Sequence, residues 1–120
     1  APRVYNRTQM AYRNAPLAQR LAREGVEAGR DASLPLLHRA FFYMPYQHAE
    51  SRPMQKESLE LYDQLRRSAS GRLAKLLEAF YQSALDNHAT ITRFGRFPQR
   101  NHALKRRTTA DEEQFLRELT

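Results

Sequence analysis

Residues 72–93 carry apolar side chains that recur at steps of three and four residues. This spacing places those side chains on one face of an α-helix, so it predicts a long helix with one face against a core. The chain shows no alternation of apolar and polar residues typical of a half-buried strand and no hairpin signal. We therefore expect an all-α protein. The stripe consists of Leu73, Leu77, Phe80, Ala84, His88 and Ile91.

The first helix is predicted from its end signals. Asn14 is a good N-cap residue and Pro16 suits a first helical turn, so we expect the helix to begin after Asn14. Gly29 is expected to end it. An apolar stripe on this helix, flanked by small residues, predicts close packing of a neighbouring helix. The stripe and its small neighbours are Leu17, Leu21 and Ala28 with Ala18, Ala22 and Gly25.

A Ser-x-Pro pattern occurs at residues 33–35 and again at 51–53, and it predicts the start of two further helices. Pro45 is expected to end the earlier of the two, because the residue before a proline avoids the helical region. Residues 46–51 then form a short connection between them, and residues 68–71 form a turn before the long helix.

The last helix is predicted after residue 108, where Thr109 and Glu112 form a capping box. Its expected buried side chains are Phe115, Leu116 and Leu119. In total we expect about five helices, and the short loops between them indicate antiparallel αα-hairpins. A chain of 120 residues is expected to form a single helical domain over residues 1–120.

The net charge of +7 is unevenly distributed along the chain. Residues 1–30 carry six Arg and two Glu, whereas residues 91–107 carry six basic residues and no acid. A field of this kind attracts anions in general. The chain has no Cys, no signal-peptide pattern and no long apolar run, so we expect a cytoplasmic protein with no disulfide and no membrane contact.

The most informative stretch is residues 93–101, in which Arg93, Arg96 and Arg100 alternate with two Phe, and Gly95 and Pro98 break the helix. Arginine suits bidentate pairing with phosphate or carboxylate. We expect an anion site formed by these three Arg with Asn101. The alternative is that the Arg side chains bind the protein's own acids or helix-end carbonyls and lock the fold.

A second candidate group surrounds the proline-bounded connection. His48 is a candidate general base with Glu50 as its orienting partner, and His88 on the long helix is a further candidate. Gln55 would add a polar group to the same pocket. No nucleophile motif and no phosphate-binding loop is present, so no reaction is assigned, and neither a metal nor a cofactor is expected.

Three blocks of this sequence resemble one known family. They are residues 42–51 followed by Gln55, then His88-x-x-Ile91, and then residues 93–101, which read Arg-Phe-Gly-Arg-Phe-Pro-Gln-Arg-Asn. The resemblance is to the bacterial domain-of-unknown-function 924 family, and it covers nearly the whole chain. It implies an all-helical, tetratricopeptide-like fold.

Two departures from the family pattern are visible. Lys105 follows Leu104, where family members usually have Gly. The family also has further N-terminal helices that end in an Asp-Gln-Phe-Pro-Arg-Asn motif, of which Pro2-Arg3 is the recognisable remnant. The resemblance therefore implies the C-terminal part of the family's usual domain, without the N-terminal helices. Such a chain would be open to homo-oligomer formation.

Three functions remain open from the sequence. The first is a binding or interaction module with a basic pocket for an anionic small molecule or an acidic peptide. The second is a hydrolase that uses His48 and Glu50 as an acid–base pair, with an Arg to stabilise an oxyanion. The third is nucleic-acid binding through residues 91–107, although no known nucleic-acid module matches.

Overall fold

The computed structural model describes residues 2–119, together with the side chains of residue 12 and of residues 14–119. These residues form six α-helices and two short 3-10 helices, with no strand among them. The prediction of an all-α fold is confirmed, although α-helices number six rather than about five. In chain order the elements are α1 (Pro2–Glu27), η1 (Arg30–Ser33), α2 (Leu36–Phe42), α3 (Met44–Gln47), α4 (Arg52–Ser68), α5 (Gly71–Phe94), η2 (Pro98–Arg100) and α6 (Ala110–Glu118).

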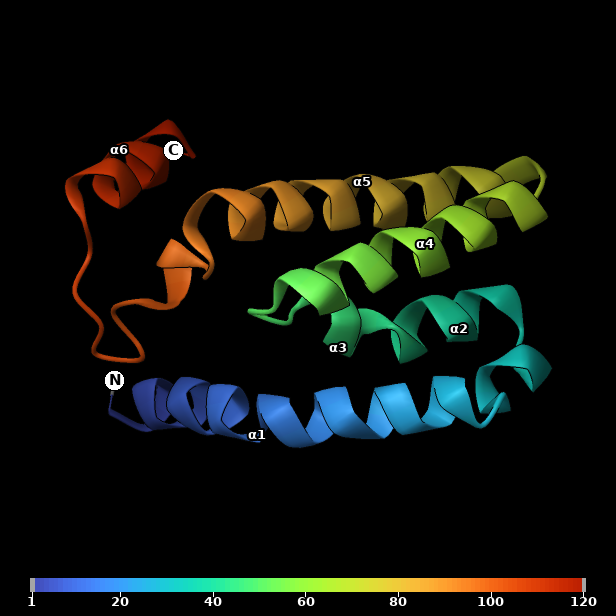
Figure 1. Cartoon of the computed structure of the whole chain (residues 1–120), viewed down its shortest axis with the longest axis horizontal. Coiled ribbons are helices and arrows are strands. Elements are labelled where there is room, and N and C mark those ends of the chain that lie inside the picture. Colours follow the sequence, from blue (N-terminus) through green and yellow to red (C-terminus); the bar gives the residue numbers. More distant parts are fainter. Residues whose placement is uncertain (1, 120) are drawn as a thin grey trace.

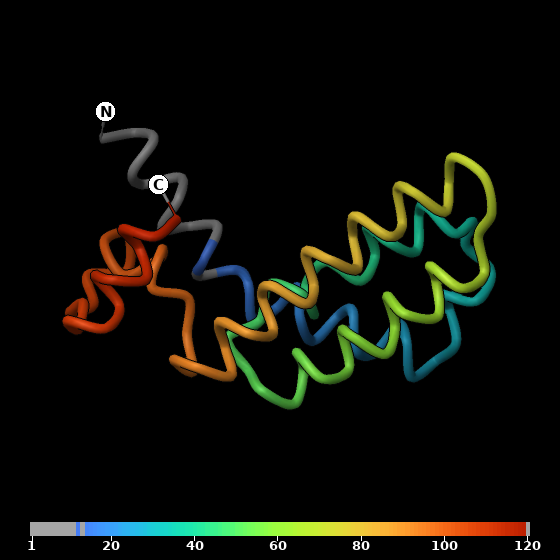
Figure 2. Tube along the Cα trace, turned by 90° about the horizontal axis from the view of Figure 1, so that it is seen from above, coloured from blue at the N-terminus to red at the C-terminus, as the bar shows by residue number. Residues whose placement is uncertain are grey.

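The helices follow one another as antiparallel neighbours. Figure 1 shows α1 along one side, α2 and α3 beside it, then α4, and α5 along the opposite side. The α4–α5 hairpin forms the most extensive pairing, and both views show the two helices side by side (Figure 2). The α6 helix lies beyond the C-terminal end of α5. The tetratricopeptide-like arrangement remains an expectation from the family resemblance.

The predicted start of the first helix was wrong. The α1 helix spans Pro2–Glu27 and has Pro16 in its interior rather than in its first turn. Proline removes one N–H from the helical ladder, but the helix continues through it, and α1 packs against α3. Pro2 and Arg3, which the family resemblance compared with an N-terminal motif, lie at the start of α1, and their side chains are outside the described set. Gly29, with φ of 72°, follows the end of the helix as predicted.

The second Ser-x-Pro pattern marks the start of a helix at its serine, as predicted, but the first does not. Ser33 belongs to η1, its hydroxyl donates to the carbonyl of Arg30, and α2 begins only after Pro35. Pro45 does not end a helix; it occupies the first turn of α3, which extends into the expected connection at residues 46–51. By contrast, the Ser51 hydroxyl accepts the N–H of Met54 and caps α4.

The long helix and its ends match their prediction. The α5 helix ends at Gly95, which adopts a left-handed conformation (φ 75°) and donates its N–H to the carbonyl of Ile91. A glycine suits this position because other residues pay a steric cost there. The capping box of α6 is also confirmed, since Thr109 and Glu112 exchange both of their hydrogen bonds.

The core contains tyrosines whose hydroxyl groups find polar partners. Tyr62 is fully buried and donates to the carbonyl of Ala40 at 2.7 Å, and Tyr43 donates to the buried carboxylate of Asp31. Such bonds remove the cost of burying a phenol. The main cluster joins α2, α4 and α5 and contains Ala40, Tyr43, Tyr62, Leu65, Leu77 and Ala84.

The stripe predicted on α1 is divided between two faces. Ala22 and Gly25 are buried, and a Cβ on Gly25 would lie 2.4 Å from Cζ of Phe42, so glycine permits the close approach of α2. Leu17 and Leu21 are instead exposed, as is Leu119 on α6, against expectation. Leu119 lies past the last turn of a short helix and therefore leaves the packed face. No helix in the described range is both long and apolar enough to cross a membrane.

Candidate functional site

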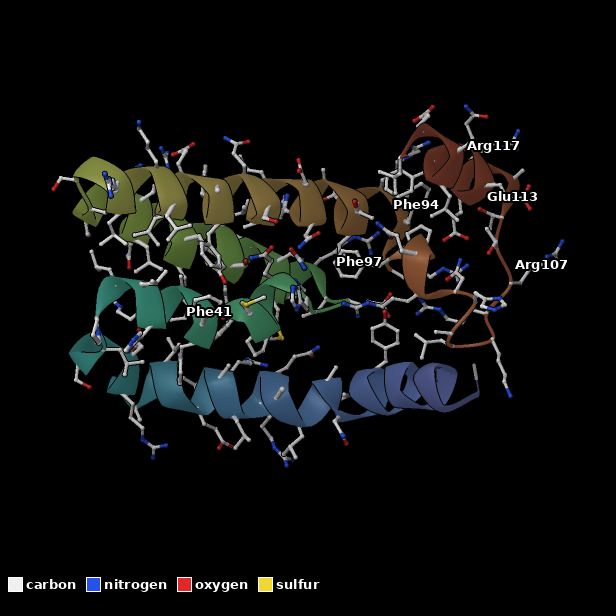
Figure 3. The ribbon with its side chains drawn as sticks, turned by 180° about the vertical axis from the view of Figure 1, so that it is seen from behind. Phe41, Phe94, Phe97, Arg107, Glu113 and Arg117 are labelled. Carbon is white, nitrogen blue, oxygen red and sulfur yellow. The ribbon has the colours of Figure 1, made fainter. Side chains whose placement is uncertain are left out.

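The segment that follows α5 folds back on the helices through its aromatic residues. Phe97 and Pro98 are buried, and Phe94 makes an edge-to-face contact with Phe115 of α6 at a centroid distance of 5.2 Å. Figure 3 shows Phe97 within the protein and Arg107 directed outward from the connecting loop. The Phe side chains therefore anchor the segment, and its charged groups surround that anchor.

Glu50 is held by this segment. Its carboxylate accepts two hydrogen bonds from the guanidinium of Arg106, at 2.8 and 3.0 Å, and a third from the N–H of Phe97 at 2.6 Å. Burial alone would raise the pKa of Glu50, but the hydrogen bonds from Arg106 and Phe97 outweigh it, so the pKa is lowered. Glu50 is thus an ionised structural partner of residues far away in the sequence.

Arg96 makes the corresponding pair with α6. Its Nε and Nη2 atoms donate to the two carboxylate oxygens of Glu112 at 2.8 and 2.7 Å, and Nη2 also reaches the carbonyl of Arg107. These bonds, led by that of Arg96, lower the pKa of Glu112 to about 2. The carboxylate belongs to the capping box, so Arg96 fixes the start of α6.

Asn101 joins the two ion pairs. Its Oδ1 atom accepts from Nε of Arg106 at 3.0 Å, and its Nδ2 atom lies 3.4 Å from a carboxylate oxygen of Glu112. The side chain is almost fully buried. We call this set the polar lock; its members are Glu50, Arg96, Asn101, Arg106 and Glu112. These contacts fit the alternative in which the segment fastens the fold.

Arg100 occupies a different environment. Its Nη2 atom donates to the backbone carbonyl of His48 at 2.8 Å, and its guanidinium lies 4.6 Å from the ring centre of Phe97 and 4.9 Å from that of Tyr12. Desolvation lowers the pKa of Arg100, although the group stays protonated. Among the described side chains, no carboxylate pairs with it.

Arg93 is exposed at the last turn of α5. Its guanidinium lies 4.6 Å from the ring centre of Phe94 and 5.9 Å from that of Phe115, and no described carboxylate pairs with it. The structure therefore separates the four residues predicted to form one anion site. Arg96 and Asn101 belong to the polar lock, whereas Arg93 and Arg100 form no ion pair with an acid among the described side chains.

His48 lies where two apolar clefts meet. One cleft, of about 270 Å³, runs between α3 and α5, and the other, of about 240 Å³, runs between α1 and α3. Met44 and His48 line both clefts, and neither cleft is lined by an acidic side chain. The residue is exposed overall, but partial desolvation of its ring, with the charge of Arg100 nearby, lowers the pKa of His48. Its imidazole is therefore neutral at pH 7.

The remaining predicted residues lie apart from this group. Gln55 is fully buried and donates to the carbonyls of Gln47 and Ala49, so it fixes the α3–α4 connection rather than facing a cleft. His88 is partly buried on α5. Within the described part of the chain, no group of three or more acidic or His side chains is placed to hold a metal ion.

The sequence analysis did not identify the structural roles of Arg106 and Glu112. Arg106 was counted only within the basic segment 91–107 considered for nucleic-acid binding, and Glu112 was recognised only as a capping residue. The long sequence separation from their partners, up to 56 residues, gives no local signal. The buried Asn101, with a donor and an acceptor to satisfy, offered the best available indication of a polar network here.

Two comparisons place the chain among known proteins. The sequence model of a family described as bacterial protein of unknown function (DUF924) matches residues 2–119. No match was found among curated proteins.

A solved structure of a protein of unknown function from Agrobacterium tumefaciens is also similar, with 34% sequence identity and a TM-score of 0.75. The similarity covers 89% of this chain and 55% of that protein, so this chain spans about half the length of that relative.

Proposed function

Because this chain belongs to the DUF924 family of bacterial proteins of unknown function, its role must be inferred from its own residues. We propose that it is a binding module for an anionic ligand with an elongated apolar body. The observation that supports this best is Arg100, a partly desolvated cation beside the clefts that meet at His48. The charge of Glu50 acts on it, but no described carboxylate forms an ion pair with it. A desolvated charge is costly unless it is compensated, and an anion would compensate it.

The shape of the clefts favours an extended ligand. They lie on either side of α3, so together they cross from α5 to α1. Arg100 stacks on Tyr12, one helical turn before Ala15, which lines the α1 cleft. A ligand with its anionic group at Arg100 would therefore extend its apolar part past Met44 toward Leu76 and Phe80.

Charge complementarity supports the same assignment. Both clefts lack acidic lining residues, and the chain has a net charge of +7. The planar guanidinium of Arg100 retains N–H groups suited to a carboxylate, and the neutral imidazole of His48 can donate or accept one further hydrogen bond.

The hydrolase alternative has less support. His48 has the neutral imidazole that a general base needs, but its expected partner Glu50 is engaged by Arg106 and by the Phe97 N–H. A base without an orienting group is a weak catalyst. If p-nitrophenyl octanoate is hydrolysed by the wild type and not by His48→Gln, this alternative replaces the binding proposal.

The test is calorimetric titration with octanoate, octylammonium and inorganic phosphate. We expect octanoate to bind best and Arg100→Gln to weaken it by about 10-fold or more, since a charge-assisted hydrogen bond contributes about 1.5–3 kcal/mol. Arg107→Gln serves as the matched control, because that exposed side chain is directed outward from its loop (Figure 3) and lines neither cleft.

Equal losses in Arg100→Gln and Arg107→Gln, or equal binding of octanoate and octylammonium, would contradict the proposal. A thermal melt of each variant identifies any loss caused by unfolding, and Arg100→Lys, which keeps the charge but not the planar donor pair, should show an intermediate affinity.

A further inference from the structure

A separate cleft lies between the C-terminal half of α5 and the α6 region. Its volume is about 470 Å³, in the range of small-molecule sites. The α5 wall contributes Asp86, Thr90 and Arg93, η2 contributes Gln99, and α6 contributes Phe115 and Leu119. None of these residues lines the clefts beside His48.

We propose that this cleft is a second, independent binding site, which takes a small aromatic monocarboxylate with its carboxylate on Arg93. The proposal does not depend on the Arg100 site.

The placement of Arg93 supports a carboxylate ligand. The guanidinium lies against the rings of Phe94 and Phe115, and the two rings contact each other edge to face. Contact with the rings holds the guanidinium near the cleft without using its N–H groups, and a guanidinium has paired donors that match the two oxygens of a carboxylate. Among the described side chains no acid takes up those donors. Gln99 provides a further amide on the same rim.

The apolar lining indicates the rest of the ligand. Leu119 is 57% exposed although it is a large apolar residue, and Phe115 is only partly buried beside it. An aromatic ring placed against these two side chains would cover surface that α6 leaves open. Burial of apolar area of this kind favours binding.

Asp86 limits the charge of the ligand. It lies on the same helix as Arg93, two turns earlier, and also lines the cleft. A dianion such as phosphate would be repelled by this carboxylate, whereas a monoanion held at the Arg93 end would be repelled less. The site should therefore prefer a monocarboxylate to phosphate.

Arg93 has a simpler explanation, namely that its charge stabilises the C-terminal end of α5. The two explanations differ in their consequences. A helix-end charge affects stability alone, whereas a ligand site also gives saturable shifts confined to α5, η2 and α6.

The experiment is a nitrogen–proton NMR titration of the full chain with phenylacetate, 2-phenylethanol and phosphate. We expect saturable shifts from phenylacetate at residues around Arg93 and in α6, and much weaker shifts from the uncharged and phosphate probes. Arg93→Gln should reduce phenylacetate affinity about 10-fold or more. Leu119→Ala, at an exposed position that the fold does not need, should also weaken it.

Two control variants test whether a loss of affinity is specific to this cleft. Arg72→Gln removes an exposed arginine at the opposite end of α5 and should leave the affinity unchanged, as should Arg100→Gln at the other proposed site. Unchanged affinity in both Arg93→Gln and Leu119→Ala, or shifts centred on His48, would overturn the proposal. An equal loss in Arg72→Gln would do the same.

Discussion

At the scale of single residues, the polar lock shows how one arginine-rich stretch separates into groups with different roles. Arg96 and Arg106 each meet a carboxylate through two donors, whereas Arg93 and Arg100 rest on aromatic rings without one. Neighbouring arginines of one motif can thus have a structural role or remain available for a ligand. Which of the two applies depends on whether the fold places a carboxylate next to the guanidinium.

Glu50→Gln tests the structural role of the lock. The amide keeps the shape of the side chain but removes the charge opposite Arg106 and turns one acceptor into a donor facing the Phe97 N–H. We expect the free energy of unfolding to fall by about 2 kcal/mol, measured by urea denaturation. Glu60→Gln on the exposed side of α4 is the control and should change it by less than about 0.5 kcal/mol. A loss no larger than that of the control would show that Glu50 is dispensable for stability.

Residue-level prediction succeeded where the signal was local. Ser51, Gly95 and Thr109 mark helix ends through bonds to residues three or four positions away, and all three behave as predicted. Pro16 was misread as a first-turn residue because the preference of proline for helix starts is local, and tertiary packing can override it. The partners of Arg96 and Arg106 were not predictable, since they depend on how distant helices meet.

At the scale of elements, α6 is a short helix that depends on its first turn. Thr109 caps it, and Glu112 connects that cap to Arg96 and to the buried Asn101. Its C-terminal part is more exposed and ends near Leu119. The attachment of α6 therefore rests on an ionised Glu112.

This dependence predicts an acid-sensitive contribution to stability. The pKa of Glu112 falls from 4.5 to about 2 on folding, so the folded state favours the ionised form. Its stabilising effect is complete above pH 4.5 and is lost as the pH falls toward 2. Thermal melts between pH 6 and pH 2 should show a smaller acid-induced decrease for Glu112→Gln than for the wild type. Glu113→Gln, at the exposed neighbouring position, should follow the wild type; an unaltered pH profile in Glu112→Gln would rule out this role.

At the scale of the whole molecule, residues 91–107 expose less positive charge than the sequence suggests. Six basic residues lie within residues 91–107, but Arg96 and Arg106 are neutralised internally and Arg100 is tied to the His48 carbonyl. The exposed cations of this segment are Arg93, Lys105 and Arg107. Nucleic-acid binding through it would rest mainly on these three exposed charges, because Arg100 is half-buried.

The expected result is therefore weak binding with a shallow salt dependence. With three phosphate contacts, the logarithm of the affinity for duplex DNA should fall with the logarithm of salt concentration at a slope of about −3, as measured by fluorescence anisotropy. A slope near −5, as six contacts would give, would restore the nucleic-acid alternative. Arg107→Gln should lower the slope by about one, whereas the exposed Arg67→Gln on α4 should not change it.

The polar lock has one further consequence, for the order in which the chain folds and opens. The α4–α5 hairpin joins residues close in sequence, whereas the Glu50–Arg106 contact closes 56 residues and the Arg100–His48 contact closes 52. Contacts of long sequence separation tend to form late, after the local hairpins have paired. Substitutions in the lock should therefore accelerate unfolding and leave the folding rate almost unchanged. The lifetime of the native state, more than the speed at which it is reached, would then be determined by the Arg-rich segment.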